Sequence, residues 1–187
     1  MNTEQDILDI ISRDEWMMEI LREARKLNLP DWWVGAGFVR NKVWDVLHGY
    51  TERTPLNDID VIYFDPKNTS IETQDAFWQQ LMDAKPGQNW SVKNQATMHI
   101  KNSDEPYTSS VDALAHWVET PTCVAVSLDK DDQLKLAAPH GIGDLINLIV
   151  RPSPLFKRST DIYKERISKK NWSQIWPKLR ILYISDK

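Results

Sequence analysis

Two stretches of this sequence decide its fold, Gly35-Ala36-Gly37-Phe38-Val39-Arg40-Asn41 and Asp58-Ile59-Asp60-Val61. The first places small residues where an apolar run passes into a helix, and backbone N–H groups at such a turn can approach a phosphate. The second places two aspartates at alternate positions of an apolar strand, so that both carboxylates point to one face. Two like charges so close favour a cation between them, and Mg²⁺ accepts carboxylate, water and phosphate oxygens. Together the two stretches predict a site for a metal-bound nucleoside triphosphate.

Each stretch also has a purely structural interpretation. We expect Gly35, Gly37, Arg40 and Asn41 to form the phosphate-binding part of the site, because a glycine lets a ligand come close and a guanidinium matches phosphate geometry. The alternative is an ordinary strand–helix turn in which Arg40 pairs with an acid such as Asp45. The motif is neither a Walker A loop nor a complete Rossmann fingerprint. The aspartate pair, in turn, is also compatible with an exposed strand face that carries acids.

The composition is that of a globular protein. The chain has 187 residues, of which 41% are hydrophobic and 27% charged, and we expect one domain over 1–187. No apolar run is long enough to predict a membrane span, and the polar, acidic first residues do not resemble a secretory signal, which favours a cytoplasmic protein. The single cysteine, Cys123, lies in an apolar run and is predicted to pack as a small buried hydrophobe.

The net charge of −4 conceals an asymmetry. Residues 151–187 contain ten Lys and Arg against three Asp and Glu, so the rest of the chain is strongly acidic. This basic C-terminal segment is compatible with attraction to phosphate or nucleic acid, and equally with a solvated helix face that offsets the acidic body.

Hydrophobic periodicity predicts alternating helices and strands joined by short connections. We expect an α/β (α+β) fold with a small mixed sheet and helices packed on it. The second helix is expected to begin at Ser12, because Ser12-Arg13-Asp14-Glu15 has capping-box spacing. The expected helices are 3–11, 12–27, 40–48, 68–84, 109–117, 142–149 and 161–169. The expected strands are 32–34, 58–64, 90–100, 123–128 and 134–138.

A small-residue turn that opens a helix, followed by Asp-x-Asp on a strand, resembles the nucleotidyltransferase superfamily that includes DNA polymerase beta. A closer resemblance, to a bacterial family of nucleotidyltransferase-like proteins without an established substrate, covers nearly the whole chain. Six motifs in order carry it: Gly37–Asp45, Asn57–Val61, Trp90–His99, Ala138–Gly141, Val150–Pro152 and Trp176–Leu179.

The resemblance implies an activity and a cofactor. Asp58 and Asp60 would be the catalytic residues and would hold Mg²⁺, which bridges triphosphate oxygens and the attacking hydroxyl. The partners implied are a nucleoside triphosphate and an acceptor that is a small molecule, a protein or an RNA.

Enzymes of the superfamily usually have a third acid on a later strand, and here its slot between Trp90 and Val92 holds Ser91. If that strand alternates through residue 100, Lys93 and His99 share the face of Ser91, where Lys93 would neutralise phosphate and His99 would act as a base. The alternative for His99 is a hydrogen-bonded strand histidine. Asp112 and Glu119 are other candidates for the third acid.

Three functions compete on these grounds. The first is a Mg²⁺-dependent nucleotidyltransferase that moves a nucleoside monophosphate onto a hydroxyl. The second is a nucleotide-binding module without transfer activity, which the absent third carboxylate favours. The third is an RNA-interacting protein that uses the basic residues between Lys157 and Lys178.

Overall fold

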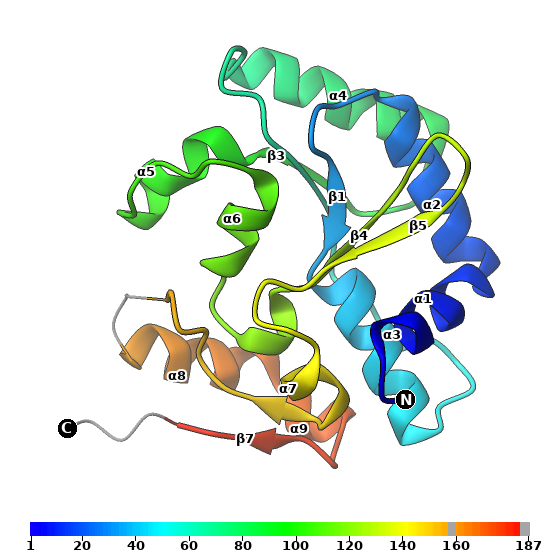
Figure 1. Cartoon of the computed structure of the whole chain (residues 1–187), viewed down its shortest axis with the longest axis vertical. Helices are drawn as coiled ribbons and strands as arrows, with labels where there is room; N and C mark the ends of the chain where they lie inside the picture. Colours follow the sequence, from blue (N-terminus) through cyan, green and yellow to red (C-terminus); the bar gives the residue numbers. More distant parts are fainter. Residues whose placement is uncertain (157–159, 184–187) are drawn as a thin grey trace.

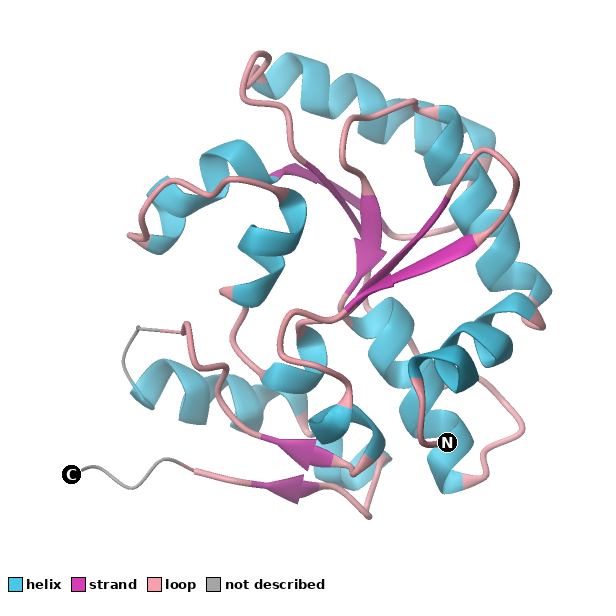
Figure 2. Ribbon diagram, viewed as in Figure 1, coloured by secondary structure: helices cyan, strands magenta, loops and turns pink. Residues whose placement is uncertain are grey.

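The strand with the paired aspartates lies inside a five-stranded sheet of the order β3-β2-β1-β4-β5 in the computed structural model (Figures 1 and 2). The structure describes residues 1–156 and 160–183. The strands are β1 (Trp33–Gly35), β2 (Ile59–Tyr63), β3 (Trp90–Asn94), β4 (Ala125–Leu128), β5 (Leu134–Ala137), β6 (Ile149–Val150) and β7 (Arg180–Ile181). β1 is antiparallel to β2 and β4, β4 is antiparallel to β5, and β2 is parallel to β3. The expectation of a small mixed sheet is therefore confirmed.

Helices surround this sheet, as Figure 2 shows. The α-helices are α1 (Glu4–Ser12), α2 (Glu15–Lys26), α3 (Gly37–His48), α4 (Ile71–Ala84), α5 (Met98–Asn102), α6 (Ser110–Ala115), α7 (Gly143–Ile146), α8 (Thr160–Lys170) and α9 (Trp172–Ile175). Two short 3₁₀ helices are η1 (Gln95–Thr97) and η2 (Thr120–Thr122). The helix expected over 142–149 ends early, because Leu148 adopts φ +58° and the chain then enters β6, which pairs in parallel with β7.

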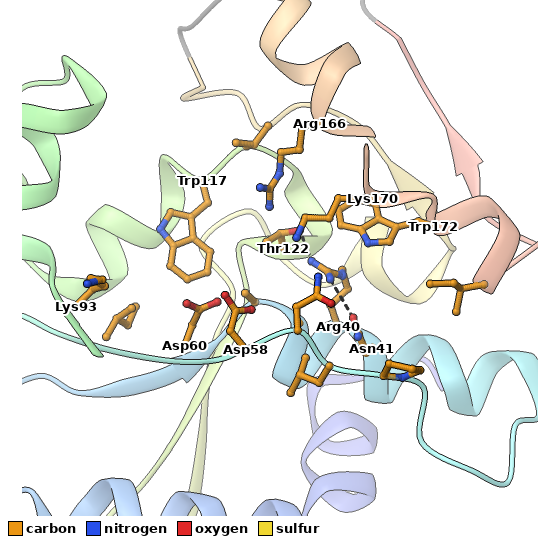
Figure 3. A pocket seen from close by; sticks show the side chains of 18 of the residues that line it. Arg40, Asn41, Asp58, Asp60, Lys93, Trp117, Thr122, Arg166, Lys170 and Trp172 are labelled. Atoms are coloured by element: carbon orange, nitrogen blue, oxygen red, sulfur yellow. Dashed lines mark hydrogen bonds between the residues drawn. The ribbon is translucent and has the colours of Figure 1, made fainter. Parts of the chain in front are cut away.

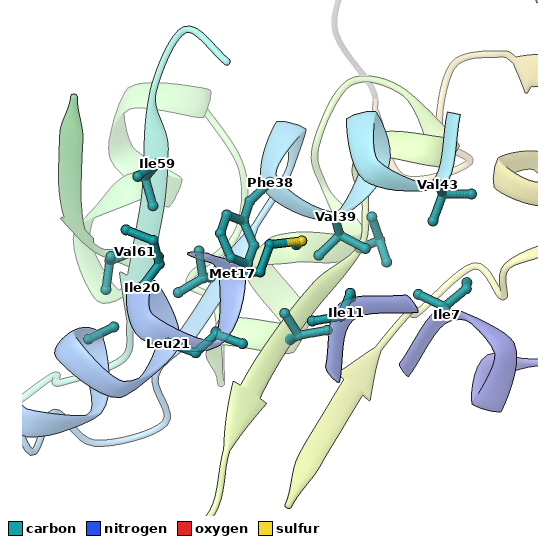
Figure 4. Packing of buried hydrophobic residues seen from close by; sticks show 14 of the residues in the cluster. Ile7, Ile11, Met17, Ile20, Leu21, Phe38, Val39, Val43, Ile59 and Val61 are labelled. Atoms are coloured by element: carbon teal, nitrogen blue, oxygen red, sulfur yellow. The ribbon is translucent and has the colours of Figure 1, made fainter. Parts of the chain in front are cut away.

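One face of the sheet is buried under α1, α2 and α3 (Figure 4). Ile59 and Val61 of β2 belong to the same buried cluster as apolar side chains of all three helices, and Figure 4 shows these side chains together. Burial of such side chains contributes about 1.5–3 kcal/mol each, so this cluster holds the strand that carries the aspartates. The labelled members on the helices are Ile7, Ile11, Met17, Ile20, Leu21, Phe38, Val39 and Val43.

The second helix begins two residues later than its capping-box spacing predicts. Asp14, not Ser12, is the N-cap of α2, and its carboxylate accepts the N–H of Met17 at 3.1 Å. The hydroxyl of Ser12 instead donates to the carbonyl of Asp9 at the end of α1. Asp14 prevails because the same carboxylate also accepts bonds from Lys42 and Arg53, both at 2.8 Å.

Replacement of Asp14 by alanine is expected to lower the free energy of unfolding by about 1–2 kcal/mol, because an N-cap and two partly shielded ion pairs are lost. Burial raises the pKa of Asp14, but the bonds from Lys42, Met17 and Arg53 outweigh it and leave the pKa below its ordinary value. The stabilisation is therefore present above about pH 4 and disappears as the pH falls through the lowered pKa. Urea denaturation at pH 7 and pH 3 measures both effects. Ser12→Ala is the control, and an equal loss in both variants would contradict the assignment of the cap.

The C-terminal part of the described chain returns to α3. The indole of Trp44 is fully buried and meets Trp172 and Trp176 edge to face, with ring centroids 5.4 Å and 5.0 Å apart. The indole N–H of Trp176 donates to the carboxylate of Asp45 at 2.8 Å. These contacts join residues that are more than a hundred positions apart and fix α9 against α3.

Cys123 is buried and unpaired, and its pKa is raised by burial and by the negative charge of Glu119. It packs against Leu114, Ala125 and Ala137, as predicted for a small hydrophobe. None of the helices within residues 1–156 and 160–183 is long and apolar enough to cross a membrane.

Candidate active site

Asp58 and Asp60 open onto a cavity of about 410 Å³. Asp60 lies in β2 and Asp58 directly precedes that strand, so their side chains share one face with Ile62, which also lines the cavity. Ile59 and Val61 point to the opposite face and are buried in the core. The alternation predicted for this strand is confirmed, and Figure 3 shows the two carboxylates side by side.

Without a bound cation, the carboxylates of Asp58 and Asp60 repel each other. Burial raises the pKa of Asp60 to about 6, and the negative charge of Asp58 adds to the rise. A hydrogen bond with Ser91 and the positive charges of Arg40 and Lys170 lower it, but they do not compensate fully. A divalent cation between the two carboxylates would remove this strain, and two carboxylates beside an open cavity leave room for the water and phosphate oxygens that Mg²⁺ prefers. The residues therefore fit Mg²⁺.

The two glycines of the turn, Gly35 and Gly37, lie in different surroundings. A Cβ on Gly35 would lie 3.1 Å from the carbonyl oxygen of Val124 and 3.2 Å from the Cβ of Ala125, so Gly35 permits close packing of β1 on β4. Gly35 is not among the described residues that line the cavity, whereas Gly37 is. Between them, Ala36 adopts φ +55° and ψ −124°, a backbone region that favours glycine. The strained residue directs the N-terminus of α3 into the cavity.

Arg40 is the central cation of the site. It is 6% exposed, and its guanidinium lies 4.3 Å from the ring centre of Trp172 and 5.1 Å from that of Trp44. Its Nη1 donates to the hydroxyl of Thr122 and its Nη2 to the side-chain oxygen of Asn41, both at 2.9 Å, while Nε is buried and has no hydrogen-bond partner among the described residues. Burial lowers the pKa of Arg40 to about 10, so the group stays charged at neutral pH.

The alternative pairing of Arg40 with Asp45 is wrong. The carboxylate of Asp45 is occupied by the indole N–H of Trp176 and by Thr54. Asn41 also lines the cavity, so the structure brings Gly37, Arg40 and Asn41 together with the two aspartates, as predicted.

Two further cations reach the cavity from α8, and sequence reasoning did not single them out. Arg166 and Lys170 lie across the cavity from Asp58 and Asp60 (Figure 3). In the sequence, only the positive charge of the C-terminal segment points to these two residues. Residues 157–159 and 184–187 of that segment lie outside the described residues. Part of that charge therefore lines the site, which the composition alone cannot distinguish from a solvated helix face.

Ser91, which occupies the position expected for a third acid, lies next to the strand that carries Asp60. Ser91 is the register partner of Asp60 across the parallel pair of β2 and β3, and Lys93 is the partner of Ile62. Lys93 lines the cavity and is exposed. In residues 1–156 and 160–183, no group of three His, Cys, Asp or Glu side chains is arranged to hold a metal ion.

The other two candidate acids have structural roles. Asp112 accepts the N–H and hydroxyl of Thr108 at the start of α6 and does not line the cavity. Glu119 is fully buried, and one of its carboxylate oxygens accepts the Nε–H of Arg166.

His99 does not share a strand face with Lys93, so the expectation of a strand over 90–100 is wrong. β3 ends at Asn94, whose side-chain oxygen accepts the N–H of Ala96 and caps η1, so the chain turns into helix before His99. His99 lies in α5, with its ring 6.0 Å from that of Tyr107, and is not among the described residues that line the cavity. Periodicity could not reveal this, because the break depends on one asparagine cap.

A family model described as nucleotidyltransferase matches residues 22–181, which include the turn, both aspartates and α8. The chain belongs to the nucleotidyltransferase family. The resemblance seen in the sequence motifs is thereby confirmed. A search among curated proteins found no match to this chain.

This nucleotidyltransferase is also similar to several solved structures. An NMR structure described as a CCA-adding enzyme head domain shares 35% identity over 98% of each chain, with a TM-score of 0.86. The Thermotoga maritima CCA-adding enzyme complexed with tRNA shares 17% identity over 95% of this chain, with a TM-score of 0.58. A CCA-adding enzyme with CTP shares 19% identity over 95% of this chain, with a TM-score of 0.55.

The similarity to these last two enzymes shows a shared fold and nothing more. The nucleotidyltransferase spans 42% and 41% of the lengths of those two enzymes. Its whole-chain match is to the head domain.

Proposed function

We propose that this protein is a Mg²⁺-dependent nucleotidyltransferase that moves a nucleoside monophosphate from a nucleoside triphosphate onto a hydroxyl group of an acceptor. The observation that supports it most directly is the placement of the Asp58–Asp60 pair and of Arg40 on walls of one cavity. A metal-bound triphosphate needs both, because it presents a cation to carboxylates and anionic oxygens to a guanidinium.

In this proposal each residue has a defined task. Asp58 and Asp60 would hold Mg²⁺, which when bound would supply positive charge for the leaving pyrophosphate and would make the acceptor hydroxyl more acidic. Arg40 binds phosphate oxygens, and its contacts with the rings of Trp44 and Trp172 keep the guanidinium fixed in advance. Gly37 lines the cavity at the start of α3, so the N–H groups there are placed to approach the phosphates. Lys93 is available to a negative charge on the other side of Asp60.

The acceptor is a small molecule, a protein or an RNA. Two of the similar structures are CCA-adding enzymes, one complexed with tRNA and one with CTP, and their chains are more than twice as long. We place the reaction in the cytoplasm, where nucleoside triphosphates are abundant.

A second candidate function is nucleotide binding without transfer. Ser91 supports it, because the register partner of Asp60 carries a hydroxyl where a carboxylate would act as a second metal ligand or base. The two functions differ in one observable quantity, the release of pyrophosphate that depends on an acceptor.

The test is a binding titration with each of the four nucleoside triphosphates, with Mg²⁺ and with a chelator, for the wild type and the Asp58→Ala/Asp60→Ala variant. We expect saturable, Mg²⁺-dependent binding that weakens by about 100-fold or more in the variant, because a metal worth several kcal/mol is lost. Asp75→Ala, an exposed acid outside the cavity, is the control. Equal affinity in wild type and double variant would refute the proposed metal site.

A pyrophosphate assay with pooled acceptors then separates the two candidate functions. Acceptor-dependent release, lost in the double variant, supports transfer. Tight binding with no release from any pool supports the silent nucleotide-binding module.

A further inference from the structure

The basic face of α8 is part of the cavity. Arg166 and Lys170 are one helical turn apart and therefore lie on the same side of the helix, and both line the cavity. Lys169, their neighbour, points to solvent and pairs with Glu165 at 2.5 Å. The buried side chains of Tyr163 and Ile167 fix the rotation of the helix, and the hydroxyl of Tyr163 donates to the carbonyl of Leu182 at 2.9 Å.

Arg166 is held by only one of its nitrogens. Its Nε donates to Glu119 at 2.5 Å, and Glu119 is fully buried. In the described part of the chain the two terminal nitrogens of Arg166 make no hydrogen bond, so the outer edge of the guanidinium is available to a ligand. Glu119 therefore anchors the arginine and leaves its donors free.

Lys170 has no hydrogen-bond or ion-pair partner among the described residues, although it is half-buried. Burial lowers the pKa of Lys170, the positive charges of Arg166 and Arg40 lower it further, and the negative charges of Asp58 and Glu119 offset only part of this effect. An unpaired cation in such surroundings lowers the stability of the fold. Such a cation is typical of a site that binds an anion.

The cluster of Arg40, Arg166 and Lys170 carries an excess of positive charge. Glu119 acts on all three cations, Asp58 and Asp60 also act on Arg40, and Asp58 also acts on Lys170. With Mg²⁺ on the two aspartates, Glu119 alone would balance the three cations, which would leave two positive charges for an anion. Asp58 and Asp60 contribute to the opposite wall, where Mg²⁺ would occupy them. The buried Nε of Arg40, which has no hydrogen-bond partner in the described part of the chain, also lies in this cluster.

We propose that Arg166 and Lys170 bind the terminal phosphates of the nucleoside triphosphate and hold the pyrophosphate as it leaves. This inference rests on the proposed function, because it assigns one end of the same site. The chemistry matches a polyphosphate: a guanidinium offers a fork of donors and an ammonium adds a point charge. The helix thus makes the site selective for triphosphates over monophosphates, with no contact to the base required.

Inorganic tripolyphosphate is a direct probe of this cluster, because it needs neither Mg²⁺ nor a base. Calorimetric titration with the full chain in a chelating buffer compares the wild type, Lys170→Met, Lys170→Arg and the control Lys169→Met. Lys170 has no partner in the described part of the fold, so its removal leaves no group there unpaired. We expect Lys170→Met to weaken tripolyphosphate binding about tenfold or more, Lys170→Arg to restore it, and Lys169→Met to bind within about twofold of the wild type.

The nucleotide arm of the experiment tests selectivity. With Mg²⁺ present, Lys170→Met is expected to reduce the preference for ATP over AMP by about tenfold, with AMP affinity unchanged. Unchanged tripolyphosphate binding in Lys170→Met overturns the inference. So does an equal loss for ATP and AMP, or a loss confined to RNA, which would assign the cations to an acceptor backbone.

The failure of this inference differs from the failure of the proposed function. Asp58→Ala/Asp60→Ala removes the metal ligands but not the cluster, so metal-free tripolyphosphate binding is expected to persist in that variant. If Lys170→Met binds normally while the double variant loses Mg²⁺-dependent binding, the metal site stands and the phosphate assignment falls. The reverse pattern refutes the metal site and retains the phosphate site.

Discussion

Replacement of Asp60 by asparagine is expected to stabilise the metal-free protein while it destroys Mg²⁺-dependent nucleotide binding. The pKa of Asp60 is raised from 3.8 to about 6 by burial and by Asp58. Each pKa unit corresponds to about 1.4 kcal/mol, so the ionised carboxylate costs up to about 3 kcal/mol. An uncharged amide of similar size avoids this cost, and we expect a gain of about 1–3 kcal/mol in the free energy of unfolding. The affinity for Mg²⁺ and nucleoside triphosphate should fall about 100-fold or more.

The gain depends on pH in a defined direction. Because the pKa is higher in the folded state, the ionisation cost is absent below about pH 4, grows between pH 4 and pH 6 and is complete above pH 6. Thermal unfolding in a chelating buffer, measured from pH 4 to pH 8, should show a difference between variant and wild type that increases up to about pH 6 and is constant above it. Asp75→Asn, outside the cavity, should show no such trend. A variant less stable than the wild type at pH 8 would mean that the two carboxylates do not repel each other.

Replacement of Trp44 by alanine is expected to cause the largest loss of stability, about 3–5 kcal/mol. The indole is fully buried, and its removal leaves a cavity beside Trp172, Trp176 and Arg40. The variant should also bind nucleotide more weakly, because Arg40 loses one of the two rings that hold it. Urea denaturation followed by circular dichroism measures the first effect, and a titration with Mg²⁺ and ATP measures the second.

Trp44→Phe is the matched variant, since it keeps an aromatic ring and most of the volume, and it should lose less than about 2 kcal/mol. Trp78→Ala, at a side chain that is 38% exposed, tests whether removal of any tryptophan has the same effect. A loss below about 1 kcal/mol in Trp44→Ala would show that the C-terminal part of the chain is not held through this residue.

The elements that depend on local pattern could be predicted from the sequence. Alternation fixes which side of β2 is buried, so the order of residues along the strand is enough to place Asp58 and Asp60 on a common face. The mixed sheet and the antiparallel pair β4–β5 follow from the same periodicity and from short connections. The slot of Ser91 could be located through the family resemblance, which implies an acid between two apolar residues of a later strand, and the structure places Ser91 beside Asp60.

The features that depend on long-range contacts could not be predicted. The N-cap of α2 is decided by Lys42 and Arg53, which lie far along the chain from Asp14. A Cβ on Gly35 would crowd the carbonyl oxygen of Val124 and the side chain of Ala125, which only the packing reveals. Arg166 and Lys170 differ from the solvent-facing Lys169 only in the direction in which α8 presents them. The position of His99 depends on the cap that Asn94 provides.

The two walls of the cavity come from distant parts of the chain. They are therefore completed at different times during synthesis. Asp45 and Trp176, whose hydrogen bond joins α3 to the C-terminal part of the described chain, are separated by 131 positions. A chain emerging from the ribosome displays its N-terminal part first, so the carboxylates of β2 exist well before α8 and its cations have been synthesised. On the proposed assignment of the site, affinity for a nucleoside triphosphate therefore arises only once α8 has been synthesised.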